Sequence, residues 1–188
     1  MPERYDLEAL TADLRTLRDT VSETHKLVAA VADAGKRFVA DRGWLLDEHR
    51  RVHPKQGIGV HLLHEEADHS LPVFVVAWGA GRGAPPHNHG AGNWGVIVGI
   101  EGAETNTWWR RLDDGGTPGF AELEAVKTAD IEPDQAVTFL PNVLHSVSNQ
   151  ADEVTVSLHI YATHLNHIER EQFDVEAKTV APFRVAVD

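Results

Sequence analysis

The 188-residue chain contains no cysteine. This absence excludes disulfides, thiolate nucleophiles, iron–sulfur clusters and cysteine-based zinc sites, so histidine and carboxylate are the strong metal ligands that remain. Long apolar runs are also missing, since none approaches the ~18–20 residues of a membrane span. The first residues, MPERYDLEAL, are too polar for a signal peptide. We therefore expect a cytoplasmic protein without a membrane partner.

Positive charge is scarce as well. Lysine and arginine total 17 against 29 acidic residues, which gives a net charge of −12. Such a field repels phosphate backbones and anionic lipid headgroups, so nucleic acid is not an expected partner. The length suits one compact domain with a substantial core.

The period of hydrophobicity changes once along the chain. Apolar residues recur at spacings of three and four from Leu7 to Phe38, which predicts a helical segment over residues 1–55. Short strand-like runs separated by turn residues follow, and they predict a β-barrel domain over residues 56–188, packed with the helices into one domain. The runs are 60–64, 72–78, 94–100, 105–109, 123–128, 136–140, 146–148, 154–161 and a weaker one at 179–187.

The stretch PPHNHG places His87 and His89 one residue apart. In an extended chain such residues point to the same side, so the two imidazoles can converge on one metal ion while Asn88 faces elsewhere. The best third ligand is His145 in FLPNVLHSVSN, because a turn precedes it and an alternating strand follows. A single histidine at a strand end is more often merely solvated, but the His-x-His pair favours a metal site.

These motifs resemble the two conserved motifs of the cupin superfamily, in residues 81–102 and 141–149. The resemblance implies a mainly β fold, a cupin-type double-sheet β-barrel (jelly roll) with an N-terminal helical segment. The common cupin pattern adds a glutamate four or five residues after the second histidine, where this chain has Asn93 and Trp94. Glu101 and Glu104 lie too far along the strand to replace it without a different register, so the chain looks like a three-histidine cupin.

A second resemblance comes from VTVSLHIYATHL. Ser157, His159 and Tyr161 alternate and share one face of a strand whose other face is aliphatic. A Ser-x-His-x-Tyr row after a three-histidine motif resembles the thiol dioxygenases, of the cysteine and 3-mercaptopropionate dioxygenase type. WGVIVGIEGAET is similar to the bacterial mercaptopropionate branch. A row of this kind can also be a buried polar network that only fixes strand register.

The thiol dioxygenase resemblance implies an activity and a cofactor. His87, His89 and His145 would hold Fe(II), and a small thiol would react with O2 to give a sulfinate. Tyr161 would be the catalytic hydrogen-bond donor to oxygen or substrate. His159 would hold the Tyr161 phenol with the help of Ser157, so these two residues are the other members of the catalytic set.

The substrate site departs from the family pattern. On the strand before Trp78 the family places an arginine or glutamine for the substrate carboxylate, whereas this chain has Val60 and His61. An acidic protein that binds an anionic thiol needs local positive charge, for which His61, Arg82 and His164 are candidates. We therefore expect a thiol other than cysteine or 3-mercaptopropionate.

The tryptophans leave two questions open. Trp94 either lines the substrate pocket or belongs to the core, depending on whether the turn after His89 contains a bulge. The adjacent Trp108 and Trp109 face opposite ways, and an exposed tryptophan there would indicate a contact with a second copy. A homo-oligomer is thus among the expected assemblies.

Two other functional classes compete with a thiol dioxygenase. One is a cupin metalloenzyme of different chemistry, such as a ring-cleaving dioxygenase or an isomerase. The other is a non-catalytic cupin that binds a small molecule. Bound iron and oxygen consumption that requires a thiol distinguish the first interpretation from both.

Overall fold

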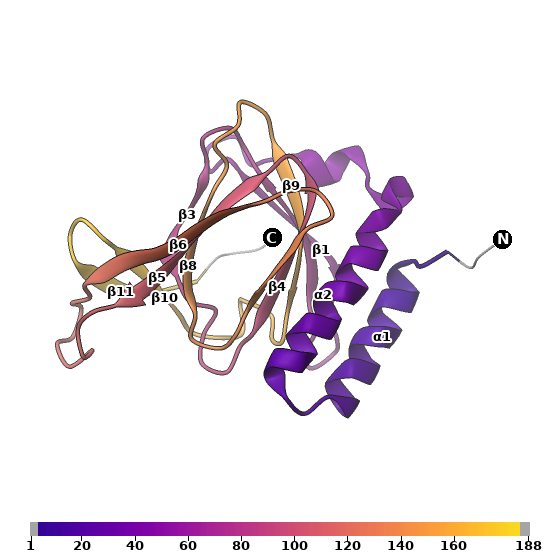
Figure 1. Cartoon of the computed structure of the whole chain (residues 1–188). Coiled ribbons are helices and arrows are strands. Elements are labelled where there is room, and N and C mark those ends of the chain that lie inside the picture. The colour runs from indigo at the N-terminus through magenta and orange to yellow at the C-terminus, as the bar shows by residue number, and fades with distance from the viewer. Residues whose placement is uncertain (1–3, 185–188) are drawn as a thin grey trace.

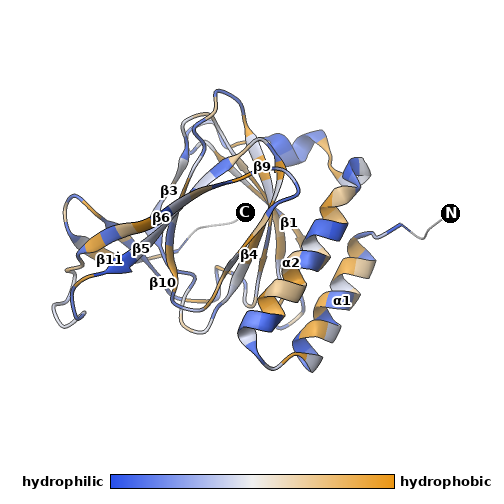
Figure 2. Cartoon of the chain, viewed as in Figure 1, coloured by the Kyte–Doolittle hydropathy of each residue, from blue (hydrophilic) through white to orange (hydrophobic). Residues whose placement is uncertain are grey.

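The computed structural model of the chain describes residues 4–184 and begins with two helices. They are α1 (Leu7–Thr20) and α2 (Thr24–Ala40), followed by the short 3-10 turns η1 (Arg42–Trp44) and η2 (Asp47–Arg50). Asp6 caps α1 by accepting a hydrogen bond from the backbone N–H of Ala9 at 3.0 Å. Both helices are amphipathic, with hydrophobic and hydrophilic residues alternating around each ribbon in Figure 2.

The rest of the described chain forms two antiparallel sheets. One has the strand order β1-β2-β9-β4-β7 and the other β11-β10-β3-β8-β5-β6. This double-sheet barrel with N-terminal helices confirms the predicted fold class (Figure 1). The strands are β1 (Ile58–His64), β2 (Val73–Trp78), β3 (Gly83–His87), β4 (Gly95–Glu101), β5 (Glu104–Arg111), β6 (Leu123–Ile131), β7 (Ala136–Phe139), β8 (Leu144–Ser148), β9 (Thr155–Tyr161), β10 (Arg170–Asp174) and β11 (Thr179–Phe183).

Strands β2 and β9 are buried on both faces, and this arrangement orients the polar row on β9. Their aliphatic residues on one face pack with α1 and α2 in the largest core cluster, as do those of β4. The opposite face of β9 looks between the sheets, where Tyr161 packs with Phe74, Trp78 and Val147. The alternation of side chains along a strand thus turns Ser157 and His159 inward, as the sequence predicted.

Two strands were not predicted from the sequence. Strand β3 contains Pro85 and Pro86, which cannot donate to a sheet ladder and therefore obscure the pattern. Strand β10 has the charged sequence REQFD, but it pairs with β11 and reaches His87 of β3 through Gln172. The last predicted strand, 179–187, ends at Phe183 in the structure, and its positions 185–187 lie outside the described residues.

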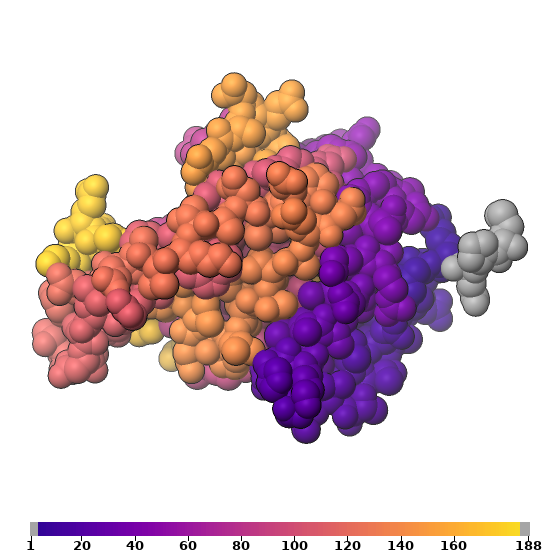
Figure 3. All heavy atoms as spheres, in the orientation of Figure 1, coloured from indigo at the N-terminus to yellow at the C-terminus, as the bar shows by residue number. Residues whose placement is uncertain are grey.

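The helices and the second sheet lie on opposite sides of the molecule. Figure 3 shows the helical residues, in indigo, covering one side, while the C-terminal strands β10 and β11 lie at the other. Within residues 4–184, no helix is both long and apolar enough to span a bilayer. The cavity described next lies between the sheets, on the side of β9 away from the helices.

Candidate active site

Three buried histidines meet between β3 and β8. His87 ends β3, His89 follows it in the turn, and His145 lies on β8 directly opposite His87 in the strand register. Their ring centroids are 4.5–5.5 Å apart, and the candidate ligand nitrogens all lie within 4.8 Å of one another. The side chain of Asn88 turns away and binds Glu171 at 2.8 Å. The predicted cluster of donor atoms is therefore present.

The hydrogen bonds of the rings decide which nitrogens are free. His87 Nδ1 donates to the carbonyl of Pro85 at 2.9 Å, and His145 Nδ1 donates to Asn106 Oδ1 at 3.1 Å. Each bond leaves Nε2 of that ring unprotonated and available to a metal ion. His145 Nε2 lies 3.0 Å from His89 Nε2, so two donor atoms already face one another.

Burial keeps these imidazoles neutral. It lowers the pKa of His87 to about 4 and lowers the pKa values of His89 and His145 well below the ordinary value. Neutral imidazole is the form that binds a metal. No described carboxylate joins the cluster, which agrees with a three-histidine set. The donors therefore fit a divalent transition metal and leave its full charge uncompensated by the protein.

The polar row on β9 forms a continuous hydrogen-bond chain. Tyr161 Oη lies 2.8 Å from His159 Nδ1, and His159 Nε2 lies 2.9 Å from Ser157 Oγ. Burial lowers the pKa of His159 to about 3 and raises that of Tyr161 far above its usual range, so both groups stay neutral. The row brings a phenol next to the histidine cluster, since the rings of Tyr161 and His89 are 5.0 Å apart.

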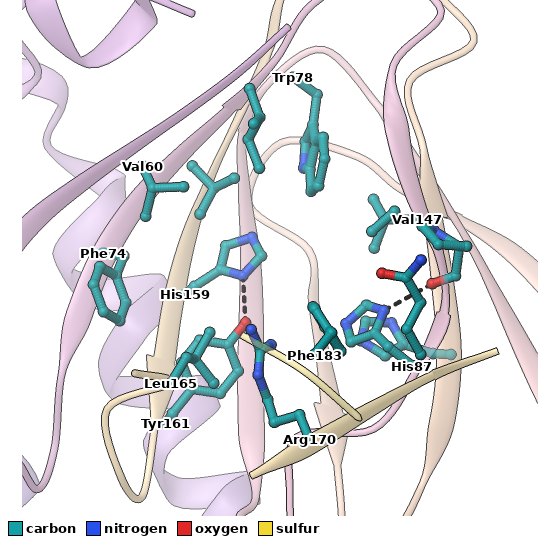
Figure 4. A pocket seen from close by; sticks show the side chains of 16 residues that line it. Val60, Phe74, Trp78, His87, Val147, His159, Tyr161, Leu165, Arg170 and Phe183 are labelled. Atoms are coloured by element: carbon teal, nitrogen blue, oxygen red, sulfur yellow. Dashed lines mark hydrogen bonds between the residues drawn. The ribbon is translucent and has the colours of Figure 1, made fainter. Parts of the chain in front are cut away.

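A cavity of about 90 Å³ opens beside the cluster, with room for several water-sized groups. Its walls are mainly apolar, and Val60, Phe74 and Trp78 are among the side chains that Figure 4 shows around it. His87, His145, His159 and Tyr161 contribute to its polar side. One small ligand in this space would touch the metal site and the phenol together.

Arg170 also lines this cavity, a role that its sequence context does not indicate. It begins β10, is only 3% exposed and stacks its guanidinium over Phe183 at 4.4 Å. Its Nε and Nη2 have no hydrogen-bond partner among the described residues. Figure 4 shows the guanidinium directed towards the Tyr161 hydroxyl. Burying a guanidinium without a counter-ion costs free energy, and residues 4–184 supply none to Arg170, so this position favours an anionic ligand.

Arg170 was missed from the sequence because its role depends on where its strand lies in the fold. Arg170 belongs to a charged segment that reads as solvated, and only the pairing of β10 with β3 carries it into the cavity. Asn106 was missed for a similar reason, because its partner His145 lies 39 positions away in the sequence. Its alternation with Glu104 on β5 is the one local sign that both side chains face inward.

The structure does not bring all predicted substrate residues to the cavity. Val60 lines it, whereas His61, Arg82 and His164 do not. His61 is half-buried and contacts the carbonyl of Arg51, and Arg82 is exposed. The ring of His164 packs edge-on against the pocket residue Phe74, with ring centroids 5.1 Å apart.

Trp94 lies in the core with the helices and does not line the cavity. The turn after His89 includes Gly90 and Gly92 in the left-handed region, with φ of 91° and 74°. Gly95, at the start of β4, is the residue opposite Tyr161 on β9. A Cβ at Gly95 would lie 2.9 Å from the Tyr161 ring, so the phenol occupies the space that a side chain would fill.

No protein-family model matches the chain, and no curated protein is significantly similar to it. Solved structures resemble it in fold. The Schizosaccharomyces pombe Cnp3 cupin domain is 17% identical over 58% of this chain and 63% of that domain, with a TM-score of 0.45. KdgF from Halomonas sp. is 11% identical over 63% and 91%, with a TM-score of 0.46. An oxalate oxidase in complex with glycolate is 15% identical over 59% and 53%, with a TM-score of 0.45.

Proposed function

We propose that this chain is a non-haem iron thiol dioxygenase that converts a small carboxylated thiol and O2 into the corresponding sulfinate. The observation that carries the proposal is the cavity where the histidine cluster, the Tyr161 hydroxyl and the Arg170 guanidinium, unpaired within residues 4–184, converge. The reaction R–SH + O2 → R–SO2H incorporates both oxygen atoms and needs no further reductant. It therefore requires only one metal site and one substrate site.

The metal would be held by His87, His89 and His145. Bound Fe(II) would supply adjacent coordination positions for the substrate sulfur and O2, which turns a reaction between two solutes into one within a single site. Neutral imidazoles alone favour this pairing, because a carboxylate ligand would offset the positive charge that attracts a thiolate.

Arg170 would bind the carboxylate of the substrate. Its buried Nε and Nη2, which no described residue binds, can form charge-assisted hydrogen bonds to two oxygens, and this fixes the distance from carboxylate to sulfur. Among residues 4–184, no aspartate or glutamate lines the cavity to pair with an ammonium group. We therefore infer a preference for mercapto acids without an amino group over cysteine, which reverses the expectation from the strand before Trp78.

Tyr161 would orient the substrate and oxygen. Its hydroxyl is fixed by His159 on one side and faces the cavity on the other, so it offers a hydrogen bond at a defined point. The apolar walls exclude bulk water around that point, and this strengthens each polar contact inside.

An oxygen electrode and a panel of thiols test the proposal. Protein loaded anaerobically with Fe(II) should consume O2 with 3-mercaptopropionate more efficiently than with cysteine, and more efficiently with either than with neutral 2-mercaptoethanol. Mass spectrometry should show the thiol plus two oxygen atoms. Protein carrying His145→Ala is the control, since it should lose both metal and turnover.

Two results would contradict the proposal. Oxygen consumption by none of the thiols, with iron bound stoichiometrically, would favour a cupin enzyme of other chemistry. Protein that binds no divalent metal, yet folds normally, would favour a small-molecule-binding cupin.

A further inference from the structure

A buried carboxyl group extends the polar row beyond Ser157. Glu104, on β5, is only 2% exposed, and its Oε1 accepts a hydrogen bond of 2.5 Å from Ser157 Oγ. Its Oε2 has no hydrogen-bond partner among the described residues. The chain of contacts thus runs from Glu104 through Ser157 and His159 to Tyr161 at the cavity. The Glu104 end of this chain is buried, and the Tyr161 end faces the cavity.

The protonation state of Glu104 determines the direction of every bond in this chain. An ionised carboxylate can only accept, so Ser157 must donate to it, and Ser157 then accepts from His159 Nε2–H. His159 is neutral and carries a single ring proton, so its Nδ1 must accept from the Tyr161 hydroxyl. In this state the phenol offers only lone pairs to the cavity.

A protonated Glu104 reverses the chain. The carboxylic acid donates to Ser157, Ser157 donates to His159 Nε2, and His159 Nδ1–H donates to the Tyr161 oxygen. The Tyr161 hydroxyl is then free to donate into the cavity. The phenol can therefore be either an acceptor or a donor towards a ligand. The protonation state of Glu104, which is separated from the phenol by Ser157 and His159, determines which of the two it is.

We propose that Glu104 is the proton store of this chain, and that it sets the donor or acceptor state of Tyr161 and can deliver a proton to the cavity. Delivery balances at every atom. Tyr161 gives its hydroxyl proton to an acceptor in the cavity and takes the Nδ1 proton of His159. His159 takes the Ser157 proton at Nε2, and Ser157 takes the proton of Glu104. The net change is one proton moved from Glu104, which becomes a carboxylate, to the cavity, and a concerted transfer leaves Ser157, His159 and Tyr161 neutral.

The surroundings of Glu104 suit this role. Burial raises its pKa to about 7, while the hydrogen bond from Ser157 lowers it by less, so both protonation states are populated near neutral pH. The titratable groups next in the chain are His159 and Tyr161, both held neutral by burial. No described side chain forms an ion pair with Glu104, so its proton is not fixed by a neighbouring charge.

In turnover, Glu104 is a positioning residue that acts through Tyr161, and this part of the inference rests on the proposed thiol dioxygenase activity. A product or intermediate that gains a proton in the cavity would draw it from the relay, and solvent would restore it between turnovers. The relay itself does not depend on the identity of the reaction. It can therefore be tested without turnover.

Carbon-13 NMR of labelled glutamate and tyrosine tests the relay in metal-free and Zn(II)-loaded protein. The chain has two tyrosines, so Tyr161→Phe assigns the Tyr161 Cζ signal, and Glu104→Gln assigns the Glu104 carboxyl signal. We expect the Glu104 carboxyl to titrate near pH 7 and the Tyr161 Cζ shift to change with the same midpoint. In Glu104→Gln the change at Tyr161 should disappear.

Two variants isolate the pathway. Ser157→Ala removes the link while it keeps the carboxyl group, so Glu104 should still titrate and Tyr161 should no longer respond. This variant also tests the relay if Glu104→Gln fails to fold. Glu101→Gln is the matched control. Glu101 ends β4, three residues before Glu104, but it pairs with Arg50 at 2.6 Å. Its replacement should leave the Tyr161 response unchanged.

Activity gives a separate readout. In Glu104→Gln the limb of the kcat profile near pH 7 should flatten, with a fall in kcat of no more than about 100-fold, the low end of the effect of general acid–base catalysis. A Tyr161 shift that is independent of Glu104 titration, or that survives in Ser157→Ala, would overturn the relay. Coupled titration without any thiol oxidation would instead leave the relay intact and reject the proposed function.

Discussion

Replacing Arg170 with methionine should change substrate binding and stability in opposite directions. The side chain is 3% exposed, and its Nε and Nη2 have no partner in the part of the chain that the structure describes, so the free protein bears the cost of an uncompensated buried charge. Methionine has a similar length and can keep the contact with Phe183, whose ring lies 4.4 Å below the guanidinium. The substitution therefore removes the charge with little loss of packing.

The two magnitudes follow from this burial. Losing one partner of a buried, hydrogen-bonded charge pair costs about 2–5 kcal/mol, so kcat/KM for 3-mercaptopropionate should fall by about 30- to 5000-fold. The cation–π contact with Phe183 contributes roughly 0.5–2 kcal/mol, which offsets part of the burial cost of the charge. We expect a net gain in stability of about 1–2 kcal/mol, which is a rise in Tm of roughly 2–4 °C for each kcal/mol in a domain of this size.

The assay compares Fe(II)-loaded variants by oxygen consumption and by thermal unfolding. Arg82→Met is the matched control, because Arg82 is exposed, lies outside the cavity and should alter neither quantity by much. Turnover of 2-mercaptoethanol, which has no carboxylate, should be nearly the same in Arg170→Met as in the unmodified protein. A loss of similar size for the carboxylated and the neutral thiol would refute a carboxylate-binding role, as would a clear fall in Tm.

Three further predictions concern the metal site and its surroundings. Asn106→Ala should weaken Zn(II) or Fe(II) binding by about 10- to 100-fold, because it removes the hydrogen-bond acceptor that orients His145. Asn88→Ala should leave metal binding unchanged, and competition with a chelator measures the affinity of both variants. Gly95→Ala should lower the free energy of unfolding by about 1–3 kcal/mol and reduce turnover, because the new Cβ would lie 2.9 Å from the Tyr161 ring; denaturant melts that match the unmodified protein would contradict this contact. The metal-free protein should lose stability as the pH falls from 6.5 towards 4, by about 1.4 kcal/mol per pH unit for each of His87 and His159. The reason is that the unfolded chain takes up protons at the ordinary pKa of 6.5, whereas the pKa values of these two residues in the folded protein are about 4 and 3. The raised pKa of Glu104 has the opposite effect on stability, but Glu104 is a single group. A melting temperature that does not change between about pH 7.5 and 5.5 would exclude buried neutral histidines.

Local pattern was enough to predict much of the fold. The change from helical spacing to alternation marks where the helices give way to strands, and the alternation on β9 places Ser157, His159 and Tyr161 on one inward face. The same reasoning joined His87 to His89 and separated both from Asn88. Each of these inferences needs only the spacing of apolar and polar residues along the chain, which can be read directly from the sequence.

The substrate side of the cavity shows where this reasoning stops. Nothing near Arg170 in the sequence marks it as buried, and the strand that carries it reads as charged surface. The position of Trp94, which the sequence left open, is set by the tertiary structure, where it packs in the core with the helices while Gly95 lies opposite Tyr161. Turn geometry and strand register are set by contacts across the sheet, and a single sequence does not contain them.

The sequence by itself determined the types of group available for chemistry: histidines without cysteine, a polar row on one strand, and an acidic chain with few basic residues. Only the tertiary structure decided which groups meet, because β10 pairs with β3 to bring Arg170 into the cavity and β5 brings Asn106 and Glu104 behind His145 and Ser157. The physical reason is that faces within a strand follow from covalent geometry, whereas neighbours between strands depend on the packing of the whole barrel.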